Sequence, residues 1–67
     1  MDIEEVMDIA VRFLTKSGYP TYKLLSIKLD HAKKEWKATF DVGFITTMII
    51  SLTIDDASGR IIAYDRT

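Results

Sequence analysis

The apolar residues of the first sixteen positions recur with the period of an α-helix. Placed at about 100° intervals, they cover an arc of about 200°, which is wider than one sheet contact requires. Asp2 can cap the start of this helix, Gly18 can end it, and Pro20 prevents it from resuming. We therefore predict a helix over residues 2–16. Its apolar arc consists of Ile3, Val6, Met7, Ile9, Ala10, Val11, Phe13 and Leu14.

From Tyr22 onward the apolar residues alternate with polar ones, which is the period of a β-strand. Polar turn segments separate the alternating runs, and Gly59 can take the positive φ that a bulged hairpin needs. The pattern predicts four strands, over about 22–30, 35–42, 47–55 and 60–66.

All connections between the predicted strands are short, which favours an antiparallel meander. The fold class is therefore α+β, a single domain over residues 1–67 in which one N-terminal helix packs on a four-stranded antiparallel sheet. Four strands span about 19 Å, whereas one helix covers only about 10 Å. Because one helix cannot cover this sheet, we expect a second copy of the chain, and hence a homodimer.

The alternation also predicts which apolar side chains remain uncovered. In the last strand it places Ile61 and Ala63 on one face of the sheet and Ile62 and Tyr64 on the other. Ile62 and Tyr64, together with Leu24 and Ile49 from other strands, are expected to form an apolar set on the outer face of the sheet, away from the helix. Together with the spare flank of the helix, we expect this set to bind a partner. These candidate partner-binding residues are Leu24, Ile49, Ile62, Tyr64, Ile9 and Val11.

Composition narrows the function classes. The chain has no cysteine, which removes disulfides and makes a closed zinc site improbable. The N-terminal segment is acidic where a secretory signal is basic, and no apolar run approaches the roughly 18 residues of a membrane span. We therefore expect a cytoplasmic protein with no contact to a membrane.

The charge of the chain is uneven although the net charge is −1. Residues 21–40 hold five lysines against Asp30 and Glu35. A basic hairpin with a neighbouring aromatic ring can bind single-stranded nucleic acid, which is the alternative function. Lysines on exposed strands also serve as solubilising charges. The candidate residues are Tyr22, Lys23, Lys28, Lys33, Lys34 and Lys37.

Two segments of the sequence resemble PepSY domains. Residues 36–42, Trp-Lys-Ala-Thr-Phe-Asp-Val, are similar to the second strand of that family. Residues 52–62, Leu-Thr-Ile-Asp-Asp-Ala-Ser-Gly-Arg-Ile-Ile, are similar to its closing hairpin, although Asp56 stands where a small residue is common. The resemblance implies a non-catalytic inhibitory or regulatory module and transfers no catalytic residue.

Residues that could carry chemistry are few. His31 is the only histidine and falls in a predicted turn, where it has no partner for acid–base work. Asp55, Asp56 and Ser58 supply oxygen atoms, but turn chemistry explains them more simply than a cation site does. We therefore expect no enzyme activity, no metal and no cofactor.

The leading hypothesis is a non-enzymatic, homodimeric module that binds another protein or a peptide through a sheet face or an edge strand. A small-ligand binder that uses the space between the helix and the sheet is a third, weaker class.

Overall fold

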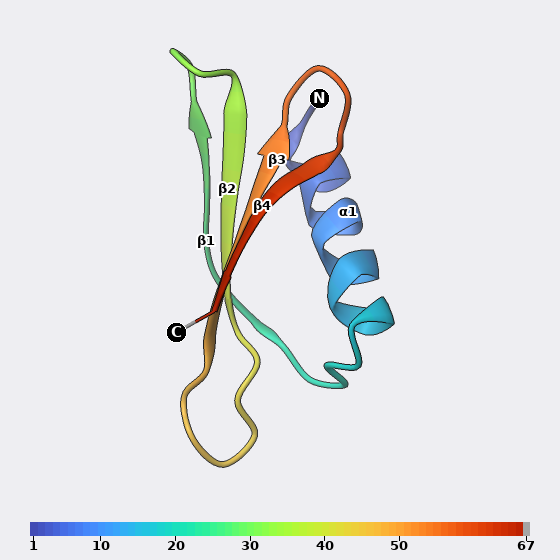
Figure 1. The fold of residues 1–67 in the computed structure, drawn as a ribbon, viewed down its shortest axis with the longest axis vertical. Coiled ribbons are helices and arrows are strands. Elements are labelled where there is room, and N and C mark those ends of the chain that lie inside the picture. The colour runs from blue at the N-terminus through green and yellow to red at the C-terminus, as the bar shows by residue number, and fades with distance from the viewer. Residues whose placement is uncertain (67) are drawn as a thin grey trace.

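The computed structural model describes residues 1–66, so Thr67, the last residue of the predicted domain, lies outside it. Helix α1 (Ile3–Lys16) precedes four strands, β1 (Lys23–Asp30), β2 (Glu35–Asp41), β3 (Ile49–Asp55) and β4 (Ile61–Arg66). The strands form one antiparallel sheet in the order β1-β2-β3-β4, and α1 lies against one face of it (Figure 1). The predicted α+β meander is confirmed.

The ends of α1 follow the predicted signals. The side chain of Asp2 accepts a hydrogen bond from the backbone N–H of Glu5 at 2.9 Å, which satisfies one of the free amides of the first turn. Gly18 has φ +89°, and the amide of Tyr19 returns to the carbonyl of Leu14 at 3.0 Å. The chain can then turn back toward the sheet.

The core lies between α1 and the two central strands. On the helix one narrow stripe is fully buried, and on β2 and β3 every second residue is buried, as the period of two predicts. The edge strands β1 and β4 contribute only half-buried residues such as Ile27, Leu29 and Ile61. The buried core consists of Val6, Ala10, Leu14, Trp36, Ala38, Phe40, Val42, Ile50, Leu52 and Ile54.

A β-bulge changes the facing of residues at the start of β1. Leu24 lies opposite Phe40 and Ser26 lies opposite Thr39, which leaves Leu25 as the extra residue. Because residues opposite each other share a face, Leu24 lies on the helix side of the sheet. The prediction that Leu24 lies on the outer face is therefore wrong.

A second bulge has the same effect in β4. Ile61 lies opposite Ile54 and Ala63 lies opposite Thr53, so Ile62 is the extra residue. One inserted residue reverses the alternation beyond it, so Tyr64 falls on the helix face, opposite Leu52. The prediction that Tyr64 lies on the outer face, where it would share that face with Ile62, is wrong for this reason.

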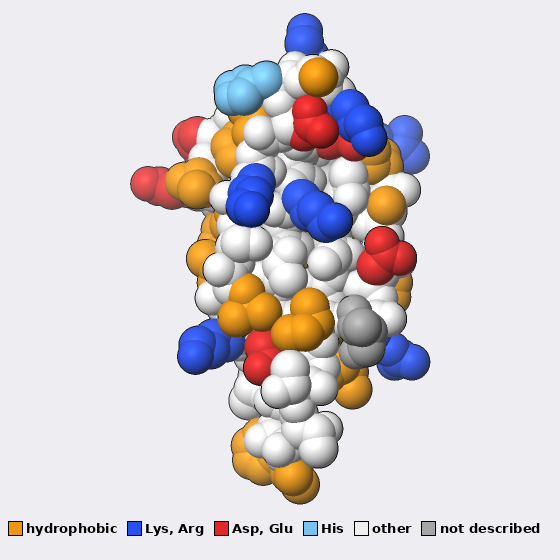
Figure 2. Space-filling view, turned by 90° about the vertical axis from the view of Figure 1, so that its left-hand side faces the viewer, with side chains coloured by type: hydrophobic (Ala, Val, Ile, Leu, Met, Phe, Trp, Pro, Cys, Tyr) orange, Lys and Arg blue, Asp and Glu red, His pale blue; other side chains and the backbone are white. Residues whose placement is uncertain are grey.

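The outer face of the sheet is consequently less apolar than predicted. Figure 2 shows two cationic side chains in the upper half of this face, neither charged nor hydrophobic surface directly below them, and two hydrophobic side chains further down. The register places Lys28 beside Lys37, and a row of Ser26, Thr39 and Ser51 next to them. Of the four predicted apolar residues, Ile49 is the one that the ladder places on this face, opposite Asp41.

Candidate interaction surface

Five large apolar side chains are exposed at one end of the sheet. The register sets the start of β1 beside the end of β2, where the β2–β3 loop begins (Figure 1). Phe44 and Ile45 at the tip of this loop are 86% and 92% exposed, and three residues at or just before the start of β1 are between 43% and 48% exposed. We call this set the apolar end; it consists of Tyr22, Leu24, Leu25, Phe44 and Ile45.

The loop that carries Phe44 and Ile45 is held by hydrogen bonds from its backbone amides to the side chain of Asp41. The carboxylate of Asp41 accepts hydrogen bonds from the amides of Gly43 at 3.0 Å and of Met48 at 3.2 Å. A Cβ on Gly43 would lie 1.6 Å from the carbonyl oxygen of Thr46, so no other residue fits this turn. The loop geometry therefore directs two apolar side chains into solvent.

At the start of β1 the chain is anchored by an aromatic contact. The ring of Tyr22 lies 6.1 Å from the ring of Phe40 in a tilted arrangement, which is a favourable geometry for two aromatic rings. The bulge that follows leaves both Leu24 and Leu25 about half exposed. This segment therefore presents apolar surface along β1, which is an edge strand of the sheet that residues 1–66 form.

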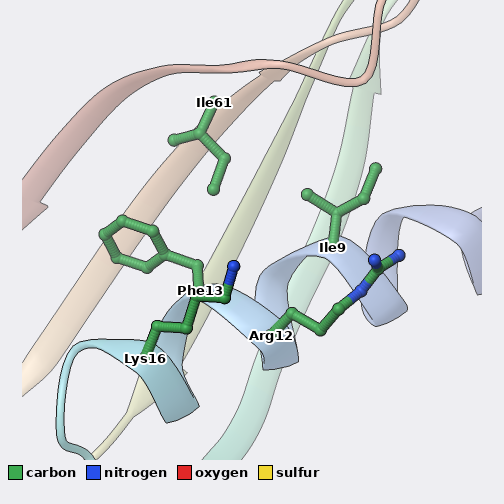
Figure 3. Close-up of a pocket in the computed structure, with 5 residues that line it drawn as sticks. All are labelled: Ile9, Arg12, Phe13, Lys16 and Ile61. Carbon is green, nitrogen blue, oxygen red and sulfur yellow. The ribbon is translucent and has the colours of Figure 1, made fainter.

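The candidate residues on the helix lie elsewhere. Ile9 is half-buried and packs against the core, and Val11 is half-buried. Ile9 also lines a shallow groove between α1 and β4, where Ile9 and Phe13 point toward Ile61 (Figure 3). Arg12 and Lys16 complete the lining of this groove, which has a volume of about 250 Å³.

Tyr64 belongs to an aromatic contact on the helix face. Its ring lies 5.5 Å from that of Phe13, and its hydroxyl lies 3.2 Å from the hydroxyl of Tyr19. The hydrogen bond from Tyr64, helped by Arg66, lowers the pKa of Tyr19, whereas the same bond raises the pKa of Tyr64. This contact ties the end of β4 to the chain that leaves α1.

The structure separates the basic candidate residues into groups. Lys28 and Lys37 lie side by side on the outer face, and Lys33 and Lys34 lie in the β1–β2 turn. Lys23 lies at the far end of β1, opposite an acidic residue, and the adjacent Tyr22 packs on the core. The predicted aromatic neighbour is therefore not beside the lysine pair.

Acidic residues lie close to the lysine pair. Asp30 lies opposite Glu35, and Glu35 lies opposite Asp55, so three carboxylates cross the sheet in one row. This row lies two residues along the strands from Lys28 and Lys37. Carboxylates this close weaken the attraction of a phosphate chain to the lysine pair.

The candidate chemical residues have structural roles. His31 is exposed in the β1–β2 turn. The carboxylate of Asp55 accepts hydrogen bonds from both the amide and the hydroxyl of Ser58 at 2.8 Å, and these bonds lower the pKa of Asp55. Asp56 accepts a hydrogen bond from the indole N–H of Trp36 at 2.6 Å. Within residues 1–66 no group of three or more acidic, histidine or cysteine side chains could hold a metal ion.

The two most exposed apolar residues were not among the predicted site residues. Phe44 and Ile45 lie directly after Gly43, outside every alternating run of the sequence. Two bulky apolar residues inside a turn segment are a signal in themselves, because turns are normally polar. Their exposure depends on the loop conformation, which the alternation does not predict.

Comparison with known proteins adds no family to this description. No family model, no curated protein and no solved structure matches the chain. Among the described residues, α1 is too short and too polar to span a membrane, and the same holds for any other helical segment there.

Proposed function

We propose that this chain is a non-enzymatic interaction module that acts as a homodimer and binds another protein or a peptide. The observation that carries the proposal is the apolar end, where five large side chains are between 43% and 92% exposed beside an open edge strand. Exposed apolar surface that gathers into a patch is typical of protein interaction sites. The exposed strand edge adds backbone groups that another strand can pair with.

The absence of catalysis is part of the same proposal. Three side chains have shifted pKa values: Tyr19 and Tyr64 bond to each other where the end of β4 meets the chain that leaves α1, and Asp55 bonds to Ser58 within a turn. The resemblance to PepSY domains, which stays a prediction, implies the same class of function. A cytoplasmic location, which a sequence without cysteine fits but does not require, belongs to the proposal as well.

The mass of the protein in solution tests the homodimer. Light scattering coupled to gel filtration, run from low to high micromolar concentration, should give a mass that rises from 7.7 kDa to twice that value. A mass of one chain at every concentration would refute the homodimer.

Binding of single-stranded nucleic acid is a second candidate, and the lysine pair is the observation in its favour. Lys28 and Lys37 are exposed neighbours on the outer face of the sheet, where Figure 2 shows two cationic side chains side by side. On this hypothesis, single-stranded RNA binds at low salt and the double variant Lys28→Glu with Lys37→Glu abolishes binding. If single-stranded RNA does not bind the unaltered protein at low salt, nucleic-acid binding is refuted as a function.

A further inference from the structure

Strand β1 is an edge of the sheet, and its outer side is free to pair with another strand. We infer that a second copy of the chain pairs antiparallel with β1 across a two-fold axis at Ile27. This inference rests on the proposed homodimer and adds its surface and register. The two sheets then form one continuous sheet of eight strands.

The register follows from the faces of the strand. Residues opposite each other in an antiparallel sheet share a face, whereas neighbours along a strand do not. The two-fold axis must therefore lie midway between one residue and the same residue of the second copy, and we name the axis by that residue. On β1, Lys23, Ser26, Lys28 and Asp30 lie on the outer face, because their partners on β2 do. With the axis at Ile27, Lys23 lies opposite Asp30 of the second copy, and the symmetry repeats this pair of opposite charges.

The same register matches the apolar residues on the helix face. Leu24, which is 43% exposed, lies opposite Leu29 of the second copy, and Ile27 lies opposite its own counterpart. The bulge residue Leu25 has no ladder partner on β2, and in the inferred dimer it is left out of the new ladder as well, so that the remaining seven residues of β1 all pair. Without the bulge, Lys23 and Asp30 would lie on opposite faces and could not pair.

Other registers on β1 are less favourable. An axis at Ser26 places Lys28 opposite Lys23 of the second copy, and an axis at Lys28 places two copies of that lysine opposite each other. Like charges directly opposite are destabilising. An axis at Leu24 or Leu29 leaves only three paired residues from each strand, counted on the seven ladder positions.

Strand β4, at the opposite edge of the sheet, offers no comparable pairing of opposite charges between two copies. The last two charged residues of β4, Asp65 and Arg66, lie opposite Ser51 and Ile50, and so on different faces. They cannot pair with each other in an antiparallel arrangement. Pairing through β1 also places the two copies of Phe44 and Ile45 at opposite ends of the assembly, where both stay free for another protein.

Cysteine cross-linking tests the register, because the chain has no cysteine of its own. The variants Ser26→Cys and Lys28→Cys change outer-face positions that lie opposite each other in the inferred dimer. The two variants, carrying different tags, are mixed and oxidised mildly, and circular dichroism shows that each is folded. Ala63→Cys on β4 is the control.

The mixed Ser26→Cys and Lys28→Cys disulfide should form roughly tenfold faster than either self-linked product, because directly opposite Cβ atoms lie about 5 Å apart and diagonal ones about 7–8 Å. Ala63→Cys should cross-link no faster than free thiols at that concentration. If the protein is dimeric by mass and this mixed product is not favoured, the register is wrong while the homodimer stands. A monomeric mass overturns both.

Discussion

At the scale of single residues, two phenylalanines that are close in the sequence have opposite surroundings. Phe40 is fully buried in β2, whereas Phe44 is 86% exposed in the loop that follows. The alternation of apolar and polar residues predicts the buried position of Phe40. It makes no prediction for Phe44, because periodicity ends at Gly43 and the loop bonds of Asp41 then decide the direction of the side chain.

The contrast gives the first prediction. Phe40→Ala should lower the free energy of unfolding by about 3–5 kcal/mol, since it removes buried contacts and leaves a cavity. Phe44→Ala should change it by about 0.5 kcal/mol or less, since the ring is exposed. Urea unfolding measures both. A large loss of stability for Phe44→Ala would show that this residue serves the fold and not an interaction.

Asp56 supports the second prediction. Its carboxylate accepts the indole N–H of Trp36, whose side chain is buried, and the amino terminus lies 3.9 Å away. Asp56→Ala leaves that N–H without its hydrogen-bond acceptor and should lower the free energy of unfolding by about 1–3 kcal/mol. Asp56→Asn keeps an acceptor oxygen and should cost less. Unfolding followed by the fluorescence of the single tryptophan measures both, and equal losses would contradict the role of the hydrogen bond.

At the scale of elements, the number, type and order of the helix and strands could be predicted from the sequence. The period of 3.6 over residues 3–16 and the period of two on the central strands are strong signals. The bulges in β1 and β4 could not be predicted, because neither contains a glycine or a break in composition. Each bulge moved a candidate residue, Leu24 or Tyr64, to the other face.

The β3–β4 turn gives the third prediction, which concerns acid. The bonds from Ser58 lower the pKa of Asp55, so the folded state favours the carboxylate. The resulting stability is present above the pKa of an unfolded aspartate, about 3.9, and is lost as the pH falls through the lower folded value.

Ser58→Ala removes the hydroxyl donor and keeps the amide donor. The pKa of Asp55 should then rise toward its ordinary value, and less stability should be lost between neutral and acidic pH. An NMR titration of the carboxyl carbon measures the pKa, and unfolding at several pH values measures the stability. An unchanged pKa in Ser58→Ala would refute this account of the turn.

At the scale of the whole molecule, the sequence predicts that one helix cannot cover a four-stranded sheet, and the structure identifies where apolar surface remains. The largest exposed fractions are at Phe44 and Ile45 of the apolar end, Leu24 and Leu25 are exposed along β1, and Ile62 is exposed on the opposite edge strand. Strand order could be predicted from the short connections, but the position of the uncovered surface depends on where α1 lies and on two bulges. A second copy on β1 would cover Leu24 and leave Phe44 and Ile45 exposed.

The most direct test of this account is sedimentation equilibrium on two matched variants. Leu24 and Ile62 are both exposed, at 43% and 53%, and each lies at the bulge of an edge strand. Leu24→Asp places a carboxylate in the inferred interface, so it should yield a monomer that remains folded. Ile62→Asp alters the other edge and should remain a dimer. A dimer in Leu24→Asp as strong as in the unaltered protein would contradict pairing through β1.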